Sequence, residues 1–200
     1  MKRVLFVCTG NTCRSPMAEA MLRERARVRG IALEVRSAGV STMDGLPVSE
    51  HAQETLRAME IPLGGASSAL TAQTVEWADL ILAMTTNHKR HLIERFPQAV
   101  DKIHTLKEYV EDRSEVLADI AELERLYSEW QVRQALGAKL TDDERARLLE
   151  IEQRIPSFDI ADPFGGSLQR YRLVADEIAE AVDRLLHSLE NSHETGAKND

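Results

Sequence analysis

A cysteine and an arginine lie six positions apart in the segment from residue 8 to residue 16, which reads Cys-Thr-Gly-Asn-Thr-Cys-Arg-Ser-Pro. This segment directly follows the apolar run at residues 4–7, which is typical of a buried strand. Backbone N–H groups of such a loop can converge on an anion, and the Arg14 guanidinium can hold two of its oxygens. The same positive charge favours the Cys8 thiolate, which is the nucleophilic form. The spacing therefore predicts a phosphatase that works through a cysteinyl-phosphate.

The position of this loop makes the prediction more specific, because Cys-x5-Arg alone occurs often by chance. Pro16 suits the first turn of a helix, where its missing N–H costs nothing, so a strand, the loop and a helix follow one another. In the alternative interpretation Cys8 is a buried structural cysteine and Ser15 only caps the helix. The arrangement of the whole segment favours the phosphatase site.

The same segment, continued by Met-Ala-Glu-Ala, resembles the phosphate loop of the low-molecular-weight protein tyrosine phosphatase family. Further matches are Ser37-Ala38-Gly39, Gly45-Leu46-Pro47 and the segment Asp162-Pro163-Phe164-Gly165-Gly166-Ser167, which is similar to the acid loop of the family. Thr12 and the Phe-Gly-Gly after Asp-Pro are similar to the bacterial protein-arginine phosphatase branch.

The candidate site has three catalytic residues: Cys8 as nucleophile, Arg14 as phosphate clamp and Asp162 as general acid. Asp159 is an alternative carboxylate, but it lacks the Pro-Phe-Gly-Gly context. The resemblance implies that Asn11 holds the loop in shape. Ser15 can donate a hydrogen bond to the thiolate, and it can also cap the helix. The expected phosphate- and substrate-binding residues are Thr9, Gly10, Asn11, Thr12, Cys13, Ser15 and Phe164.

The identity of the substrate depends on Thr12 and the acid loop. Tyrosine phosphatases of the family usually carry a bulkier aliphatic residue at the position of Thr12 and two aromatic residues after Asp-Pro. Here Phe164 is followed by Gly165-Gly166, so one wall of a phenol site is missing. The resemblance therefore implies phosphoarginine in proteins as the substrate, with phosphotyrosine as the alternative.

Cys13 has two interpretations, as a small packed residue or, as the resemblance implies, as a partner that pairs reversibly with Cys8 on oxidation. An arsenate reductase would need further redox cysteines downstream, and the chain has only these two. A non-catalytic phosphate-binding or redox-sensing module would not need Asp162. An adaptor would not need Cys8.

The composition of the chain limits the classes of protein and of partner that remain possible. The 200 residues are 43% apolar and carry a net charge of −8, which suits one globular protein and argues against nucleic acid as a partner. We expect no membrane span and no signal peptide, and a cytoplasmic, reducing setting. His88 and His91 share a helix face without a third ligand nearby, so we expect a solvated face, no metal and no cofactor.

The element pattern predicts an α/β fold with a parallel sheet and helices on both faces. Strands are expected near 3–8, 33–38, 79–84 and 102–106, and helices near 15–29, 48–59, 71–77, 86–96 and 168–189. The resemblance implies four strands in the order 2-1-3-4. Residues 1–110 and 156–190 then form the phosphatase domain, and 191–200 a flexible tail.

The family normally has a short connection where this chain has an insertion at residues 111–155. Apolar residues recur at spacings of 4, 3, 4 and 3, Gly137 interrupts the pattern, and Thr141 with Glu144 forms a capping box. We therefore predict an antiparallel hairpin of helices near 112–136 and 142–154. Its two apolar seams bury each other or pack on the rest of the protein, or else the hairpin binds a partner, a second copy or a protein substrate. The seam residues are Val116, Ile120, Leu123, Tyr127 and Trp130, facing Leu148, Ile151 and Ile155.

Overall fold

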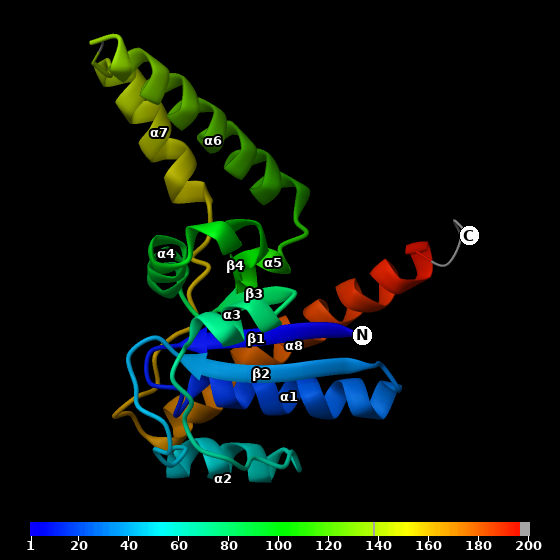
Figure 1. The fold of residues 1–200 in the computed structure, drawn as a ribbon. Helices are drawn as coiled ribbons and strands as arrows, with labels where there is room; N and C mark the ends of the chain where they lie inside the picture. The colour runs from blue at the N-terminus through cyan, green and yellow to red at the C-terminus, as the bar shows by residue number, and fades with distance from the viewer. Residues whose placement is uncertain (138, 197–200) are drawn as a thin grey trace. The chain divides into compact units, whose positions relative to one another are not determined.

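The chain divides into two compact units in a computed structural model that describes residues 1–137 and 139–196. One unit combines Met1–Val110 with the chain from Phe158 on, and the other is Glu111–Ser157. The first unit contains a sheet with its helices, and the second contains a pair of helices (Figure 1).

Four parallel strands form the sheet of the first unit: β1 (Lys2–Cys8), β2 (Leu33–Gly39), β3 (Leu80–Ala83) and β4 (Ile103–Thr105). Their order is β2-β1-β3-β4, which confirms the expected fold. β1 pairs with β2 on one side and with β3 on the other. Cys8 is therefore the last residue of a central strand, at the point where the strand order reverses, which is where α/β sheets bind ligands.

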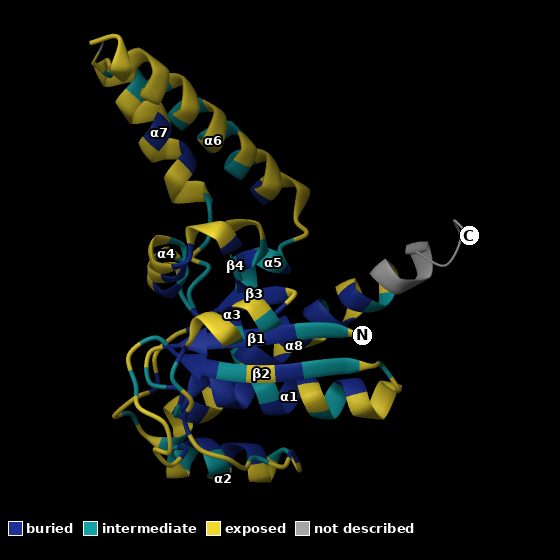
Figure 2. Cartoon of the chain, viewed as in Figure 1, coloured by how far each residue is buried: buried dark blue, intermediate teal, exposed yellow. Residues whose placement is uncertain are grey.

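Helices cover both faces of this sheet because the side chains of β1 alternate between them. Val4 and Phe6 pack with α1 (Arg14–Arg29), α2 (Glu50–Ala58) and α8 (Leu168–Gly196). Leu5 and Val7 pack with α3 (Ala72–Trp77) and α4 (Thr86–Arg95). All four β1 side chains are fully buried, and Figure 2 shows the burial of the sheet. Burial on both faces explains why residues 4–7 are continuously apolar.

Two short elements after α4 were not predicted: the 3-10 helix η1 (Pro97–Lys102) and the single-turn helix α5 (Leu106–Tyr109). Pro97 ends α4, as expected, but it also occupies the first position of η1. Helix α5 has a capping box between Thr105 and Glu108, a pattern that is visible in the sequence.

The last helix is longer than predicted. We expected it to end near residue 189 and residues 191–200 to form a flexible tail, whereas α8 continues to Gly196. No glycine or proline lies between Gly166 and Gly196, so nothing in the sequence ends the helix earlier. Residues 197–200 lie outside the described part of the chain.

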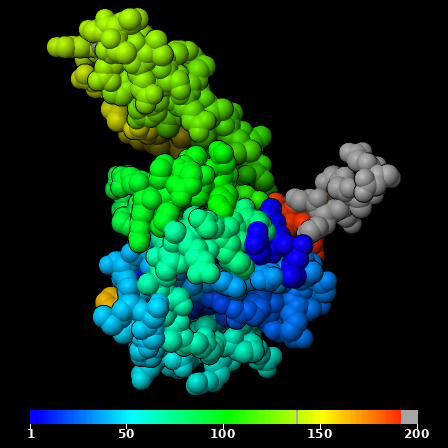
Figure 3. Space-filling view, in the orientation of Figure 1, coloured from blue at the N-terminus to red at the C-terminus, as the bar shows by residue number. Residues whose placement is uncertain are grey.

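The second unit consists of α6 (Ser114–Ala135) and α7 (Asp142–Arg154), two antiparallel helices in contact along their length (Figures 1 and 3). Val116, Leu148 and Ile151 are buried in this unit. Thr141 caps α7 through the expected box with Glu144. Three ion pairs join the helices: Arg154 with Asp119 at 2.6 Å, Arg147 with Glu122 at 2.9 Å, and Arg133 with Glu144.

None of the helices within the described residues is long and apolar enough to cross a membrane.

Candidate active site

The loop between β1 and α1 is held at the carboxyl edge of the sheet by the chain that follows β2. The backbone N–H of Val40 donates to the Cys8 carbonyl, and that of Ser41 to the Thr9 carbonyl, both over 3.0 Å. A Cβ atom on Gly39 would lie 2.7 Å from the Thr9 carbonyl oxygen. Glycine in the Ser37-Ala38-Gly39 segment thus allows this close approach of two backbones.

Asn11 fixes the shape of the loop. Its backbone is in the left-handed region (φ 53°), which asparagine tolerates better than most residues. The Asn11 amide donates to Ser15 Oγ over 2.9 Å and to Ser37 Oγ over 2.8 Å, and its oxygen accepts from the Ser68 N–H over 2.7 Å. One buried side chain therefore ties the loop to α1, to β2 and to the segment before α3.

The Cys8 thiol lies 2.9 Å from the Ser15 hydroxyl, and both side chains are buried. Because Ser15 Oγ already accepts from Asn11, its hydrogen is available to the sulfur. Ser15 is not the helix cap that we considered, since α1 begins at Arg14 and its N-cap position is Cys13. The structure therefore places Ser15 behind the sulfur, in the first turn of α1.

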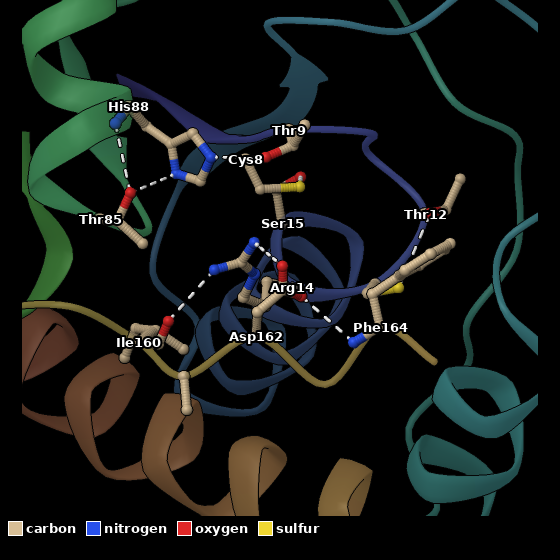
Figure 4. A network of polar contacts seen from close by, with 12 residues as sticks. Cys8, Thr9, Thr12, Arg14, Ser15, Thr85, His88, Ile160, Asp162 and Phe164 are labelled. Carbon is tan, nitrogen blue, oxygen red and sulfur yellow. Dashed lines mark hydrogen bonds and ion pairs between the residues drawn. The ribbon is translucent and has the colours of Figure 1, made fainter. Parts of the chain in front are cut away.

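Arg14 and Asp162 form an ion pair near Cys8, although 148 positions separate them in the chain (Figure 4). Arg14 is 5% exposed. Its Nη1 donates to the Ile160 carbonyl over 3.2 Å, and its Nη2 lies 3.1 Å from Asp162 Oδ2. The carboxylate also accepts from the Phe164 N–H over 3.2 Å, so the acid loop folds around its own aspartate.

Asp159, the alternative carboxylate, has a different environment. It accepts hydrogen bonds from the backbone N–H of Thr86 over 2.7 Å and from the Thr86 hydroxyl over 2.9 Å. Thr86 is the first residue of α4, so Asp159 stabilises the start of that helix.

A cavity of about 230 Å³ opens above the thiol. Phe164 stands at its rim with 77% of its surface exposed. An open groove of about 700 Å³ shares Gly10, Thr12 and Phe164 with this cavity. Of the predicted site residues, Asn11 and Ser15 lie behind the cavity wall. The others line the cavity: Cys8, Thr9, Gly10, Thr12, Cys13, Arg14, Asp162 and Phe164.

Tyr171 is a buried neighbour of the site that sequence reasoning missed. Ser49 donates to its hydroxyl over 3.1 Å, and the hydroxyl lies 3.2 Å from Cys13 Sγ. Burial and the contact with Cys13 raise the pKa of Tyr171 to about 12. Cys8 and Cys13 are both free and line the same cavity, and their pairing on oxidation stays a prediction.

His88 is the second residue that sequence reasoning missed. We predicted a solvated helix face, but the structure buries this side chain between Thr9 and Thr85, whereas His91 is exposed. Thr85 is the N-cap of α4 and accepts a hydrogen bond from the His88 N–H. A threonine before a helical segment is a sequence signal for a helix start, and it places His88 in the first turn. Within residues 1–137 and 139–196, no group of three or more potential ligands could hold a metal ion.

Comparison with known proteins identifies the family of this chain. The model of the low molecular weight phosphotyrosine protein phosphatase family matches residues 3–136, and the chain belongs to this family. A protein-arginine-phosphatase of Geobacillus stearothermophilus is 38% identical over 188 residues, which cover 94% of this chain and 96% of that protein. A protein-arginine-phosphatase of Bacillus subtilis strain 168 is 35% identical over 186 residues, which cover 93% of this chain and 95% of that protein.

Solved structures show the same fold. An arginine phosphatase mutant with a phosphorylated active-site serine has a TM-score of 0.70 and 34% sequence identity to this chain. The match covers 94% of this chain and 95% of that one. The family, the fold and the cysteine-centred cavity together define a phosphatase-type site.

Proposed function

We propose that this protein is a protein-arginine phosphatase, a hydrolase that removes the phosphoryl group from phosphoarginine in proteins through a cysteinyl-phosphate. The observation that carries the proposal is the convergence of Cys8, Arg14 and Asp162 on one cavity whose rim combines Thr12 with a single aromatic residue, Phe164. The names of the two relatives at 38% and 35% identity support the same substrate.

In the first step the Cys8 thiolate attacks phosphorus, an S–P bond forms and the P–N bond to the guanidine breaks. Arg14 and the loop N–H groups stabilise the charge that develops on the phosphoryl oxygens. When these oxygens take the Arg14 fork, Asp162 leaves its ion pair with Arg14. Freed from this ion pair, the Asp162 carboxylate takes up a proton from solvent and gives it to the departing nitrogen.

In the second step water attacks the phosphorus of the cysteinyl-phosphate. Asp162, now a carboxylate, takes a proton from that water, the S–P bond breaks and inorganic phosphate is released. The Ser15 hydroxyl, 2.9 Å from the sulfur, stabilises the returning thiolate with a hydrogen bond. The cycle needs no further reactant.

Substrate choice follows from the rim of the cavity. A guanidinium is planar and polar at its edge, so the short hydroxyl side chain of Thr12 suits it better than an aliphatic one. A phenol ring gains most from two apolar walls, and only Phe164 supplies one, since Gly165 follows it. The second candidate is a tyrosine phosphatase, which the family description favours.

The test compares kcat/KM for one peptide carrying phosphoarginine with that for the matched peptide carrying phosphotyrosine, using Cys8→Ser as the blank for turnover. We expect a strong preference for phosphoarginine. A preference for phosphotyrosine would replace the substrate assignment and keep the mechanism. No turnover of either peptide would overturn the proposed function.

We also propose that the hairpin of α6 and α7 is a contact surface for the phosphorylated protein or for a second copy of the chain. The bulky apolar side chains of Leu117, Val132, Leu136 and Leu149 are exposed in this unit. Residues 111–156 carry twelve acidic and seven basic residues, so a partner surface with basic groups is favoured. A reducing compartment such as the cytoplasm would keep both cysteines as thiols.

A further inference from the structure

His88 is buried beside the phosphate loop, and the chemistry proposed above does not use it. The residue is only 7% exposed. Its Nε2 lies 2.8 Å from Thr9 Oγ1, and its Nδ1 lies 2.9 Å from Thr85 Oγ1 (Figure 4). Thr9 directly follows Cys8 and lines the cavity. The imidazole therefore joins the start of α4 to the residue next to the nucleophile.

The hydrogen bonds around Thr85 assign the ring hydrogen of His88. The backbone N–H of His88 donates to Thr85 Oγ1 over 3.2 Å. With this bond in place, the Thr85 hydroxyl can give its own hydrogen to Nδ1. In the other tautomer the backbone N–H and Nδ1–H would both point at the same oxygen, whose hydrogen would be directed away from the ring. The arrangement in which the Thr85 hydroxyl both accepts from the backbone and donates to the ring places the ring hydrogen on Nε2.

This tautomer determines what the Thr9 hydroxyl can do. When Nε2–H donates to Thr9 Oγ1, the Thr9 hydrogen cannot point at the ring and is left for another acceptor. Thr9 lines the cavity above the nucleophile together with Cys8 and Arg14, so an acceptor bound in this cavity can take the hydrogen. Thr9 therefore presents an O–H donor at the place where an anion is expected to bind.

The ring has to be neutral for this arrangement, because an imidazolium could not accept from Thr85. Burial, followed by the positive charge of Arg14, lowers the pKa of His88 to about 4. The carboxylates of Asp162 and Asp159 oppose this shift, and His91 adds to it slightly. His88 is therefore uncharged at neutral pH.

We propose that His88 is a positioning residue that turns the Thr9 hydroxyl into a hydrogen-bond donor for a phosphoryl oxygen of the bound substrate. The inference rests on the proposed function, because it assigns a further part of the same site. The donor is oriented before the substrate arrives, and such preorganised donors stabilise the charge of a transition state without reorganisation.

The first test measures the tautomer directly. The chain has six histidines, so spectra of the ¹⁵N-histidine-labelled protein, compared with those of His88→Gln, assign the His88 ring. We expect a neutral ring with its hydrogen on Nε2 at pH 7, unchanged at pH 5.5. A ring with its hydrogen on Nδ1, or an imidazolium at pH 7, would overturn the proposal. This result does not depend on which substrate is hydrolysed.

The second test separates positioning from support of the fold. Glutamine can place an amide donor near the position of Nε2, whereas asparagine is too short to reach Thr9. We expect Thr9→Val and His88→Asn each to lower kcat roughly tenfold or more, with His88→Gln recovering much of the loss. In the Thr9→Val background, Asn and Gln at position 88 should be indistinguishable, because the group that His88 orients is gone.

Equal losses in His88→Asn and His88→Gln, or losses that persist in the Thr9→Val background, would show a merely structural role and overturn the proposal. Thermal unfolding of each variant identifies variants that fail to fold, in which case the tautomer measurement alone decides. The kcat of each single and double variant at positions 9 and 88 is measured on a phosphoarginine peptide and on 4-nitrophenyl phosphate. If the wild type hydrolyses only 4-nitrophenyl phosphate and the variants show the expected pattern on it, the substrate assignment is rejected and the role of His88 is kept.

Discussion

At the scale of single residues, Thr12 is the side chain on which the proposed substrate choice depends. It is half-buried and belongs both to the cavity above Cys8 and to the adjoining groove. Replacing Thr12 by isoleucine adds apolar surface where a phenol ring would pack and removes the hydroxyl beside the guanidinium. We expect the ratio of phosphotyrosine to phosphoarginine kcat/KM to rise about tenfold or more. Thr12→Ser is the matched control, and an unchanged ratio in Thr12→Ile would reject Thr12 as the selector.

His88 also predicts how stability depends on pH. Its pKa is about 4 in the folded protein and about 6.5 when unfolded, so between these values the unfolded chain binds a proton that the folded protein does not. Stability from this residue is present above pH 6.5 and is lost as the pH falls toward 4. Between pH 7 and pH 5 we expect a loss of about 2 kcal/mol.

Urea unfolding of the wild type and of His88→Gln at both pH values isolates this contribution, because the remaining titrating groups are common to the two proteins. The variant should lose less stability on acidification than the wild type. Equal pH dependence in the two proteins would mean that His88 is not held neutral in the folded state.

At the scale of elements, the acid loop before α8 depends on a close contact between Gly166 and Arg170. A Cβ atom on Gly166 would lie 2.6 Å from Arg170 Cδ and 2.9 Å from the Pro163 carbonyl oxygen. Arg170 Nε donates to the Asp162 carbonyl over 3.1 Å, so the same arginine also holds the backbone of the proposed acid. The second glycine of the loop thus has a packing role besides leaving out an aromatic wall.

We therefore expect Gly166→Ala to displace Asp162 and to lower kcat roughly tenfold or more on phosphoarginine, whose leaving nitrogen needs a proton. The loss should be smaller on 4-nitrophenyl phosphate, whose leaving group departs without one. Gly64→Ala is the matched control, because a Cβ there meets nothing within 4 Å. Equal losses on both substrates would contradict a role through the acid.

The elements that the sequence predicted best are those with a strong local signal. The run at residues 4–7 and the loop from Cys8 to Arg14 are contiguous, so strand, loop and helix start were predicted together. The cap at Thr141 was also predicted correctly. Helix α5 was missed although Thr105 and Glu108 carry the same kind of signal.

Contacts between distant segments could not be predicted in this way. Asp162 was assigned only through the family resemblance, because nothing local relates it to Arg14. His88 and Tyr171 reach the loop only because parallel strands place the ends of β1 and β3 at one edge and α8 packs beneath α1. From the sequence alone, His88 looked like part of a polar helix surface.

At the scale of the whole molecule, the chain separates into a phosphatase unit and the hairpin unit Glu111–Ser157. Ion pairs join the two helices of the hairpin to each other, and its buried residues Val116, Leu148 and Ile151 belong to neither apolar cluster of the first unit. The hairpin should therefore be removable without unfolding the first unit. Replacing residues 112–155 by a short linker should leave kcat/KM on 4-nitrophenyl phosphate unchanged and lower it on a phosphorylated protein. Leu136→Ser is a milder variant for comparison, because it removes one exposed apolar side chain and leaves the buried residues of the hairpin in place.

The result that would contradict the docking proposal is an equal effect on the two substrates, including no effect on either. Sedimentation of the full chain and of the shortened one distinguishes a protein-substrate contact from self-association, since only the second changes the oligomeric state.

The proposed mechanism requires that a phosphoryl group passes from phosphoarginine to Cys8. The measurement that tests it most directly is rapid quenching of the wild-type protein mixed with a phosphoarginine protein, followed by mass spectrometry that locates the covalent phosphoryl group. We predict one phosphoryl group on Cys8 that appears before inorganic phosphate and is absent in Cys8→Ala. Release of phosphate with no covalent species, or a phosphoryl group on any other residue, would contradict the account.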